Sequence, residues 1–249
     1  MSGIIQLTLL LLVLGVLSLL PFFERFSKDA PHRMAAVKQL EESMPPELLE
    51  EDAEWFQAWK ASGYDQEVYM PYFKQLDNKT GTGVRECFSS SAAMVASFYR
   101  RVKSDDQYNE IRAKFGDTTS VEAQLAALRS LGLEAEFRKD GNSEMVELEI
   151  ENGRPVLVGY LSAGNMLLGQ PPMCSGLGCG HWAVISGYSQ KNSDDPLWIL
   201  QDPRGYPEME KGGWSNPHLG RNVKVRQAAF KSRWESEGPS TGWVILVND

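Results

Sequence analysis

Residues 87–99 read Cys-Phe-Ser-Ser-Ser-Ala-Ala-Met-Val-Ala-Ser-Phe-Tyr, and this stretch predicts a helix that begins at a cysteine. Its small Ser and Ala side chains would let the helix pack closely against a neighbouring element. A thiol at a helix N-terminus lies at the positive end of the helix dipole, which lowers its pKa and favours the nucleophilic thiolate. A buried structural cysteine is the competing interpretation, because that is the more common fate of a lone cysteine. The stretch makes Cys87 a candidate nucleophile.

Two stretches in the second half of the chain carry side chains that could serve this thiol. Gly-His-Trp-Ala-Val-Ile-Ser-Gly-Tyr predicts a strand that begins near His181, and Leu-Trp-Ile-Leu-Gln-Asp-Pro-Arg-Gly predicts one that ends at Asp202. A turn over residues 188–197 would make the two strands a hairpin, in which Asp202 can accept a hydrogen bond from the His181 ring. Such a set can form a nucleophile, its base and the group that orients the base. The competing interpretations are a hydrogen-bonded core or surface histidine and a turn aspartate in Asp-Pro-Arg-Gly.

The order of the remaining elements indicates the fold class. The pattern predicts helices first and strands afterwards, which favours an α+β fold with a mostly antiparallel sheet. The expected helices cover residues 87–101, 104–115 and 120–131, and the expected strands cover residues 134–138, 155–160, 182–188, 197–201 and 242–247.

Composition narrows the class of protein further. The chain has 249 residues, 42% of them apolar, which is typical of a globular chain with one large domain or one domain plus appendages. Its net charge is −8, and no basic patch with interleaved aromatic residues is present, so nucleic acid is not an expected partner. The Gly-rich segment 176–180 lacks the Lys-Ser/Thr of a phosphate-binding loop and precedes a strand. No cofactor is expected.

The N-terminal segment predicts a membrane anchor. Residues 3–23 contain no charged side chain, and as a helix they would span about 31 Å, close to the thickness of a hydrocarbon core. A cleavable signal peptide is the competitor, but no Lys or Arg precedes the run and Leu-Pro-Phe-Phe-Glu is a poor cleavage context. We therefore expect a single-pass transmembrane helix over residues 1–23, a juxtamembrane helical linker over 24–66 and the main domain over 67–249.

The side of the membrane that carries the main domain stays open. Basic residues such as Arg25 and Lys28 follow the span, which would place the domain in the cytoplasm by the positive-inside rule. Cys174 and Cys179, five residues apart in a Gly-rich loop, could instead close a small disulfide in an oxidising compartment and leave Cys87 as the free thiol. Two reduced loop cysteines are the alternative to that disulfide.

A zinc site is a further alternative for the cysteines. The three cysteines and His181 would make a Cys₃His set. The spacing Cys-x₄-Cys-x-His is not usual for zinc, and no second cysteine pair exists, so no metal is expected.

Four blocks in this order resemble a known family. They are Tyr-Phe-Lys-Gln-Leu-Asp-Asn at 72–78, Cys87 with Ser-Ser-Ser-Ala-Ala-Met, Gly-His-Trp-Ala-Val-Ile-Ser-Gly-Tyr at 180–188, and Asp-Pro-Arg-Gly at 202–205. Together they resemble the papain-like cysteine peptidases of the bacteriocin-processing (double-glycine leader) type, which includes bacterial and phage members. The resemblance implies a papain-like fold with Cys87 as nucleophile and His181 as general base and acid. It also implies Asp202 as the orienting group and Gln75 in the oxyanion hole.

The chain departs from the family pattern at two places. Phe88 follows the cysteine where the family usually has Gly, and Gln75 stands twelve residues before Cys87, because Lys-Thr-Gly-Thr-Gly-Val-Arg-Glu intervenes. The second departure bears directly on the role of Gln75.

Together these observations predict a membrane-anchored cysteine endopeptidase that works through a thioester intermediate. The expected partners are the membrane and a peptide or protein substrate, either a protein leader or linker or a cell-wall peptide stem. Substrate identity and oligomeric state stay open. The alternative function is a catalytically inactive membrane binding module that uses a peptidase fold.

Overall fold

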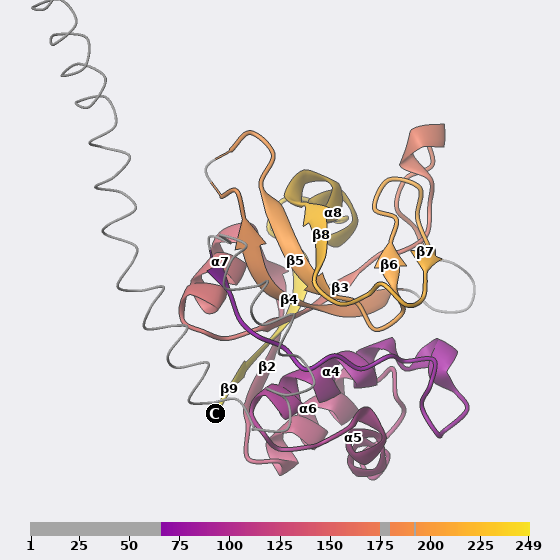
Figure 1. Cartoon of the computed structure of the whole chain (residues 1–249), viewed down its shortest axis with the longest axis vertical. Helices are drawn as coiled ribbons and strands as arrows, with labels where there is room; N and C mark the ends of the chain where they lie inside the picture. Colours follow the sequence, from indigo (N-terminus) through magenta and orange to yellow (C-terminus); the bar gives the residue numbers. More distant parts are fainter. Residues whose placement is uncertain (1–65, 175–179, 192) are drawn as a thin grey trace, which may run out of the picture. The chain divides into compact units, whose positions relative to one another are not determined.

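The fold is built around an antiparallel sheet with helices on both faces (Figure 1). The computed structural model describes residues 66–174, 180–191 and 193–249. In these residues the sheet runs in the order β2-β9-β3-β4-β5-β8, with β1 paired to β4. Its strands are β1 (Gln66–Glu67), β2 (Glu134–Gly141), β3 (Val156–Tyr160), β4 (His181–Ser189), β5 (Leu197–Gln201), β8 (Val223–Arg226) and β9 (Gly242–Asn248). A separate ribbon pairs β6 (Tyr206–Pro207) with β7 (Trp214–Asn216).

The three helices predicted from the sequence are present, each somewhat shorter than expected. They are α4 (Cys87–Phe98), α5 (Asp105–Arg112) and α6 (Val121–Ser130). Ser104 and Ser120 cap α5 and α6, since their side chains accept hydrogen bonds from backbone N–H groups in the first turn. Helix α4 ends before the predicted Arg101, because Arg100 takes a left-handed conformation with φ of 60°.

The helices cover two faces of the sheet. Helices α4, α5 and α6 gather on one side, and α8 (Gln227–Trp234) lies on the other (Figure 1). Trp182 and Val184 belong to the same core as α4, whereas Ala183 and Ile185 belong to the core that contains residues of α7 (Ser143–Glu151) and α8. Successive side chains of a strand point to opposite faces, so β4 is buried at all nine positions. Burial on both faces explains why this strand reads as an apolar run rather than an alternating one.

Several elements of the structure have no clear signal in the sequence. Helices α7 and α8, strand β8, and the short 3₁₀ turns η1 (Gly83–Arg85) and η2 (Met166–Leu168) were not expected. The five predicted strands are all present as β2, β3, β4, β5 and β9, with small shifts at their ends. Strands β4 and β5 pair antiparallel, which confirms the predicted hairpin between residues 181 and 201. The α+β class with an antiparallel sheet is therefore confirmed.

The predicted membrane anchor over residues 1–23 lies outside the described residues, as does the linker up to residue 65. Among the residues that the structure describes, no helix has both the length and the apolar character needed to cross a membrane. The domain boundaries at residues 23 and 66 stay predictions.

Candidate functional site

Helix α4 places the candidate nucleophile at its first residue. Cys87 begins the helix and is partly exposed, whereas most of the side chains that follow it are buried. The Oγ atom of Ser91, one turn further on, donates to the backbone carbonyl of Trp182 at 3.0 Å. Because Trp182 follows His181 at the start of β4, this bond ties the nucleophile helix to the strand that carries the imidazole.

The hairpin brings the imidazole and the carboxylate together. His181 is the first residue of β4, and Asp202 directly follows β5, its antiparallel neighbour. The Nε2 atom of His181 lies 2.9 Å from Oδ1 of Asp202, and both side chains are buried. His181 also forms a hydrogen bond with the Cys87 thiol. The three residues singled out from the sequence are thus adjacent in space.

The charges of this group favour a thiolate–imidazolium pair. Burial raises the pKa of the Cys87 thiol, but the charge of His181 and its hydrogen bond outweigh burial, and the net pKa is lowered. Burial lowers the pKa of His181, but the charges of Asp202 and Cys87 outweigh it and raise the pKa to about 9. Proton transfer from sulfur to the ring is therefore favoured in the resting site, and it leaves the sulfur in its nucleophilic form.

The Asp202 carboxylate is buried and receives hydrogen bonds on both oxygens. Oδ1 accepts the backbone N–H of Arg204 at 2.9 Å and the indole N–H of Trp214 at 3.2 Å, in addition to its contact with His181. Oδ2 accepts the hydroxyl of Tyr160 at 2.7 Å. A carboxylate removed from water is costly unless its oxygens find donors. These contacts hold Asp202 in one orientation.

Two aromatic rings enclose the imidazole. The ring centroid of Trp214 lies 4.7 Å from that of His181, and that of Tyr160 lies 5.3 Å away, both in edge-on geometry. The guanidinium of Arg204 lies over the Trp214 ring, 4.4 Å from the centroid of that ring. Packing against these two rings restricts the orientation of the imidazole, and the burial of both side chains keeps water from the bond between His181 and Asp202.

Sequence reasoning missed Tyr160 and Trp214. Tyr160 ends β3 directly opposite His181 in the strand register, so pairing the two predicted strands in that register would have identified it. Trp214 lies in β7, which carries no strong strand pattern, and no sequence signal singles it out.

Gln75 is buried beside two parts of this site. Its backbone N–H donates to the carbonyl of Pro203, the residue after Asp202, at 2.9 Å. Its side-chain Nε2 donates to the carbonyl of Gly83 at 2.7 Å, in the segment that leads into α4. Gln75 thus lies between the turn that follows Asp202 and the segment that precedes Cys87. The second N–H of its side-chain amide is available to another acceptor.

The candidate disulfide between Cys174 and Cys179 lies outside the described residues, because Cys179 does. The zinc alternative needs the same cysteine. Within residues 66–174, 180–191 and 193–249, no three His, Cys, Asp or Glu side chains form a group that could hold a metal ion.

Comparison with known proteins gives one family. Residues 67–240 match the sequence model described as the Peptidase_C39 like family. No curated protein matches the chain.

Several solved structures are similar. One is a double glycine motif protease from an AMS/PCAT transporter in complex with the leader peptide (18% identity over 74% of this chain and 94% of that chain, TM-score 0.45). Another is the peptidase domain of Streptococcus ComA, a bi-functional ABC transporter (21% identity, 66% and 91% covered, TM-score 0.42). A third is a C39-like peptidase from Bacillus anthracis (16% identity, 74% and 98% covered, TM-score 0.46).

Proposed function

The chain belongs to the Peptidase_C39 like family and is a cysteine peptidase, and we propose that it cleaves peptide bonds through Cys87, His181 and Asp202. The observation that carries this proposal is the buried His181, which contacts the Asp202 carboxylate and the Cys87 thiol at once. A histidine held between a carboxylate and a thiol is the arrangement that activates a cysteine nucleophile.

The proposed reaction proceeds in two stages. The Cys87 thiolate attacks the substrate carbonyl carbon, and the carbonyl π electrons move to the oxygen. The tetrahedral intermediate collapses to a thioester as the C–N bond breaks, and the His181 imidazolium gives its proton to the leaving amine. Water then attacks the thioester while His181 takes its proton, and the acid product leaves as the thiolate is restored. Asp202 keeps the ring oriented and balances its positive charge throughout.

The oxyanion would be held by two N–H donors. The first N–H groups of an α-helix have no acceptor within the helix, so the backbone N–H of Cys87 is one candidate. The remaining N–H of the Gln75 amide is the other, since the first N–H is directed to Gly83. This assignment of Gln75 is supported by the resemblance and by its burial between Pro203 and Gly83.

The proposed substrate is a peptide segment near a membrane, either a protein leader or linker or a peptide stem of the cell wall. The first class is supported by the sequence blocks that resemble leader peptidases. Proximity to a membrane is supported by the uncharged run over residues 3–23. A single-pass anchor would confine the enzyme to substrates presented at the membrane surface. The side of the membrane on which the domain lies is determined by the membrane-attachment experiment described below.

A digestion experiment tests the peptidase assignment. The wild-type protein, Cys87→Ala and Cys174→Ala are incubated with internally quenched peptides, with and without a Gly-Gly junction, and with purified cell-wall stem peptides. We expect the wild type and Cys174→Ala to cleave at least one of these classes, and Cys87→Ala to cleave none while keeping the wild-type melting temperature. Cleavage by Cys87→Ala would refute the mechanism. No cleavage by any variant would favour the inactive binding module.

Membrane attachment needs its own test. The full chain and a form that lacks residues 1–23 are expressed and extracted with alkaline carbonate. The full chain should stay in the membrane fraction and the shortened form should not. Protease added to intact cells or inverted vesicles then reports the side of the domain. Release of the full chain by carbonate would contradict the anchor.

A further inference from the structure

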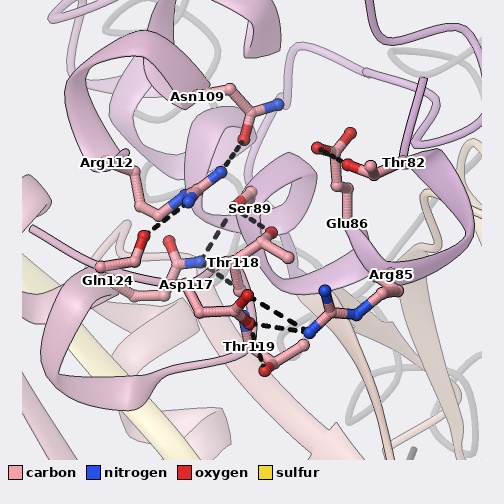
Figure 2. Close-up of polar contacts among 11 residues, drawn as sticks. Thr82, Arg85, Glu86, Ser89, Asn109, Arg112, Asp117, Thr118, Thr119 and Gln124 are labelled. Atoms are coloured by element: carbon pink, nitrogen blue, oxygen red, sulfur yellow. Dashed lines mark hydrogen bonds and ion pairs between the residues drawn. The ribbon is translucent and has the colours of Figure 1, made fainter. Parts of the chain in front are cut away.

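The segment between Gln75 and Cys87 folds onto the side chain of Glu86. The carboxylate of Glu86 is buried, and its Oε2 atom accepts the amide N–H of Asn78 at 2.7 Å. Its Oε1 atom accepts the hydroxyls of Thr80 at 2.7 Å and Thr82 at 2.8 Å. Figure 2 shows the contact between Thr82 and Glu86. We call Glu86 with Asn78, Thr80 and Thr82 the loop clamp.

The loop clamp joins residues of this segment to one another through side-chain hydrogen bonds. Thr80 and Thr82 are solvent-exposed residues, and the apolar side chain of Val84 is 67% exposed, so the segment gains little from burial of apolar groups. Because a buried carboxylate is costly without donors, Glu86 favours the one loop conformation that brings the amide and both hydroxyls to it.

This conformation determines where the carbonyl of Gly83 lies. Gly83 is buried, and in the sequence it lies between Thr82 and Glu86. Its carbonyl accepts a hydrogen bond from the Gln75 side-chain amide at 2.7 Å. A Cβ atom at Gly83 would lie 2.1 Å from the backbone carbonyl oxygen of Gln75. A larger residue at this position could therefore not approach the Gln75 backbone so closely. The acceptor that orients the Gln75 amide therefore belongs to the loop that Glu86 holds.

The loop clamp also extends to the nucleophile helix. Glu86 directly precedes Cys87, and the Asn78 amide lies within 3.2 Å of the Ser90 hydroxyl in the first turn of α4. Ser90 in turn donates to the buried Asp105 of α5 at 3.1 Å. On the outside, an exposed ion pair joins Arg85 to Asp117 (Figure 2). That surface pair is expected to contribute little by itself.

We infer that Glu86 and its donors Asn78, Thr80 and Thr82 are positioning residues for the Gln75 amide. The inference rests on the proposed function, in which Gln75 donates to the oxyanion. It accounts for the long spacing between Gln75 and Cys87: of the eleven intervening residues, the last eight, 79–86, return the chain to Gln75 and supply the carbonyl that orients it. The loop clamp thus acts on the transition state through Gln75 and leaves the thiolate unaffected.

The test uses a charge-preserving variant. Thr80→Val with Thr82→Val removes both hydroxyl donors to Oε1, whereas Thr80→Ser with Thr82→Ser keeps them. Thr119→Val is the matched control, because Thr119 donates to Asp117 nearby and does not contact Glu86. The readouts are kcat and KM on the quenched peptide that the wild type cleaves fastest, the rate of Cys87 alkylation by iodoacetamide, and the melting temperature.

We expect the valine pair to lower kcat about 10-fold, a part of the 10²–10³-fold attributed to a complete oxyanion donor. KM should change less than about twofold, and the alkylation rate should equal that of the wild type. The serine pair should restore kcat, and Thr119→Val should have no effect. In a Gln75→Ala background the valine pair should cause no further loss of kcat.

Several outcomes would overturn the inference. They are wild-type kcat in the valine pair, a parallel loss of alkylation rate, failure of the serine pair to restore kcat, or additivity with Gln75→Ala. Wild-type kcat in Gln75→Ala would also overturn it. If the melting temperature of the pair falls near the assay temperature, Thr82→Val alone is measured under the same criteria. In each case loss of activity in Cys87→Ala leaves the proposed peptidase function intact, whereas cleavage by Cys87→Ala refutes that function itself.

Discussion

The rings of Phe88 and Trp182 stack face to face, with centroids 3.9 Å apart and planes 5° from parallel. Phe88 follows Cys87 in α4, and Trp182 follows His181 in β4. The stack therefore joins the two elements that carry the thiol and the imidazole. The stack gives a physical role to Phe88, which stands at the position where the family usually has Gly.

Replacing Phe88 with Gly should loosen the site as well as the core. Loss of the buried ring and a glycine in the helix should together cost about 4 kcal/mol of unfolding free energy. Because α4 would no longer be held against β4 by the stack, alkylation of Cys87 at pH 6 should slow. Urea denaturation and iodoacetamide kinetics measure the two effects. Phe115→Ala is the control at an exposed ring and should cost less than about 1 kcal/mol. A wild-type alkylation rate in Phe88→Gly would refute the positioning role.

Peptidase activity should follow a bell-shaped pH profile. The thiolate is lost as pH falls through the lowered pKa of Cys87, and the imidazolium is lost as pH rises through the His181 pKa of about 9. The acidic limb of kcat/KM should therefore lie below the ordinary cysteine pKa of about 8.5, and the basic limb should lie near 9. Alkylation rates between pH 4 and 10 report the acidic limb independently. Alkylation that follows a single titration near 8.5, as in an unfolded chain, would contradict the ion pair.

Asp202→Asn should move the basic limb of the pH profile to lower pH. The Asp202 charge is the largest influence that raises the pKa of His181, so its loss should move the limb from about 9 to lower pH. The ring would also lose its charged partner, and kcat/KM should fall on the order of 10²–10⁴-fold. A kcat/KM pH series measures both effects. An unchanged basic limb would show that Asp202 does not control the imidazole.

Tyr160→Phe should move the same limb in the opposite direction. Without the hydroxyl, Oδ2 of the buried Asp202 loses its donor, and the carboxylate charge acts more strongly on His181. We expect the basic limb to rise and the unfolding free energy to fall by about 1–3 kcal/mol. Tyr99→Phe is the matched control, since it removes a hydroxyl that donates to the Val247 carbonyl at 2.8 Å away from the site. An equal shift of the limb in both variants would exclude a specific role for Tyr160.

Arg233 should be important for stability. Its buried guanidinium donates to four backbone carbonyls: those of Leu161, Ala163 and Gly164 in the segment after β3, and that of Met209 between β6 and β7. Arg233→Met would leave these carbonyls without their donor, and we expect a loss of about 3–5 kcal/mol.

Lys231→Met serves as the control for Arg233 on the same helix. It removes an ion pair between the exposed ammonium of Lys231 and the largely buried carboxylate of Glu235, and should cost about 1 kcal/mol, well below the loss expected for Arg233. Thermal denaturation of both variants measures the difference. Similar melting temperatures would contradict the structural role of Arg233.

The sequence was sufficient for features that depend on local pattern. Small apolar and hydroxyl residues after Cys87 predicted α4, serine caps predicted the starts of α5 and α6, and the apolar runs on either side of a turn predicted the hairpin of β4 and β5. Adjacency of His181 and Asp202 followed from that hairpin, because antiparallel pairing places the start of one strand beside the end of the next. The roles proposed for Cys87, His181, Asp202 and Gln75 in catalysis stay predictions.

The surroundings of these residues depend on contacts between elements that are distant in the sequence. Tyr160 reaches Asp202 from 42 positions away in the chain, and Trp214 reaches it from the ribbon of β6 and β7, which has no strong sequence pattern. Helices α7 and α8 were missed although they cover the second face of the sheet. Local propensity and hydrophobic periodicity specify elements, whereas the contacts that orient Cys87, His181 and Gln75 depend on how distant elements pack. The chain by itself therefore identified the thiol and its partners, and the packing decided how each is held.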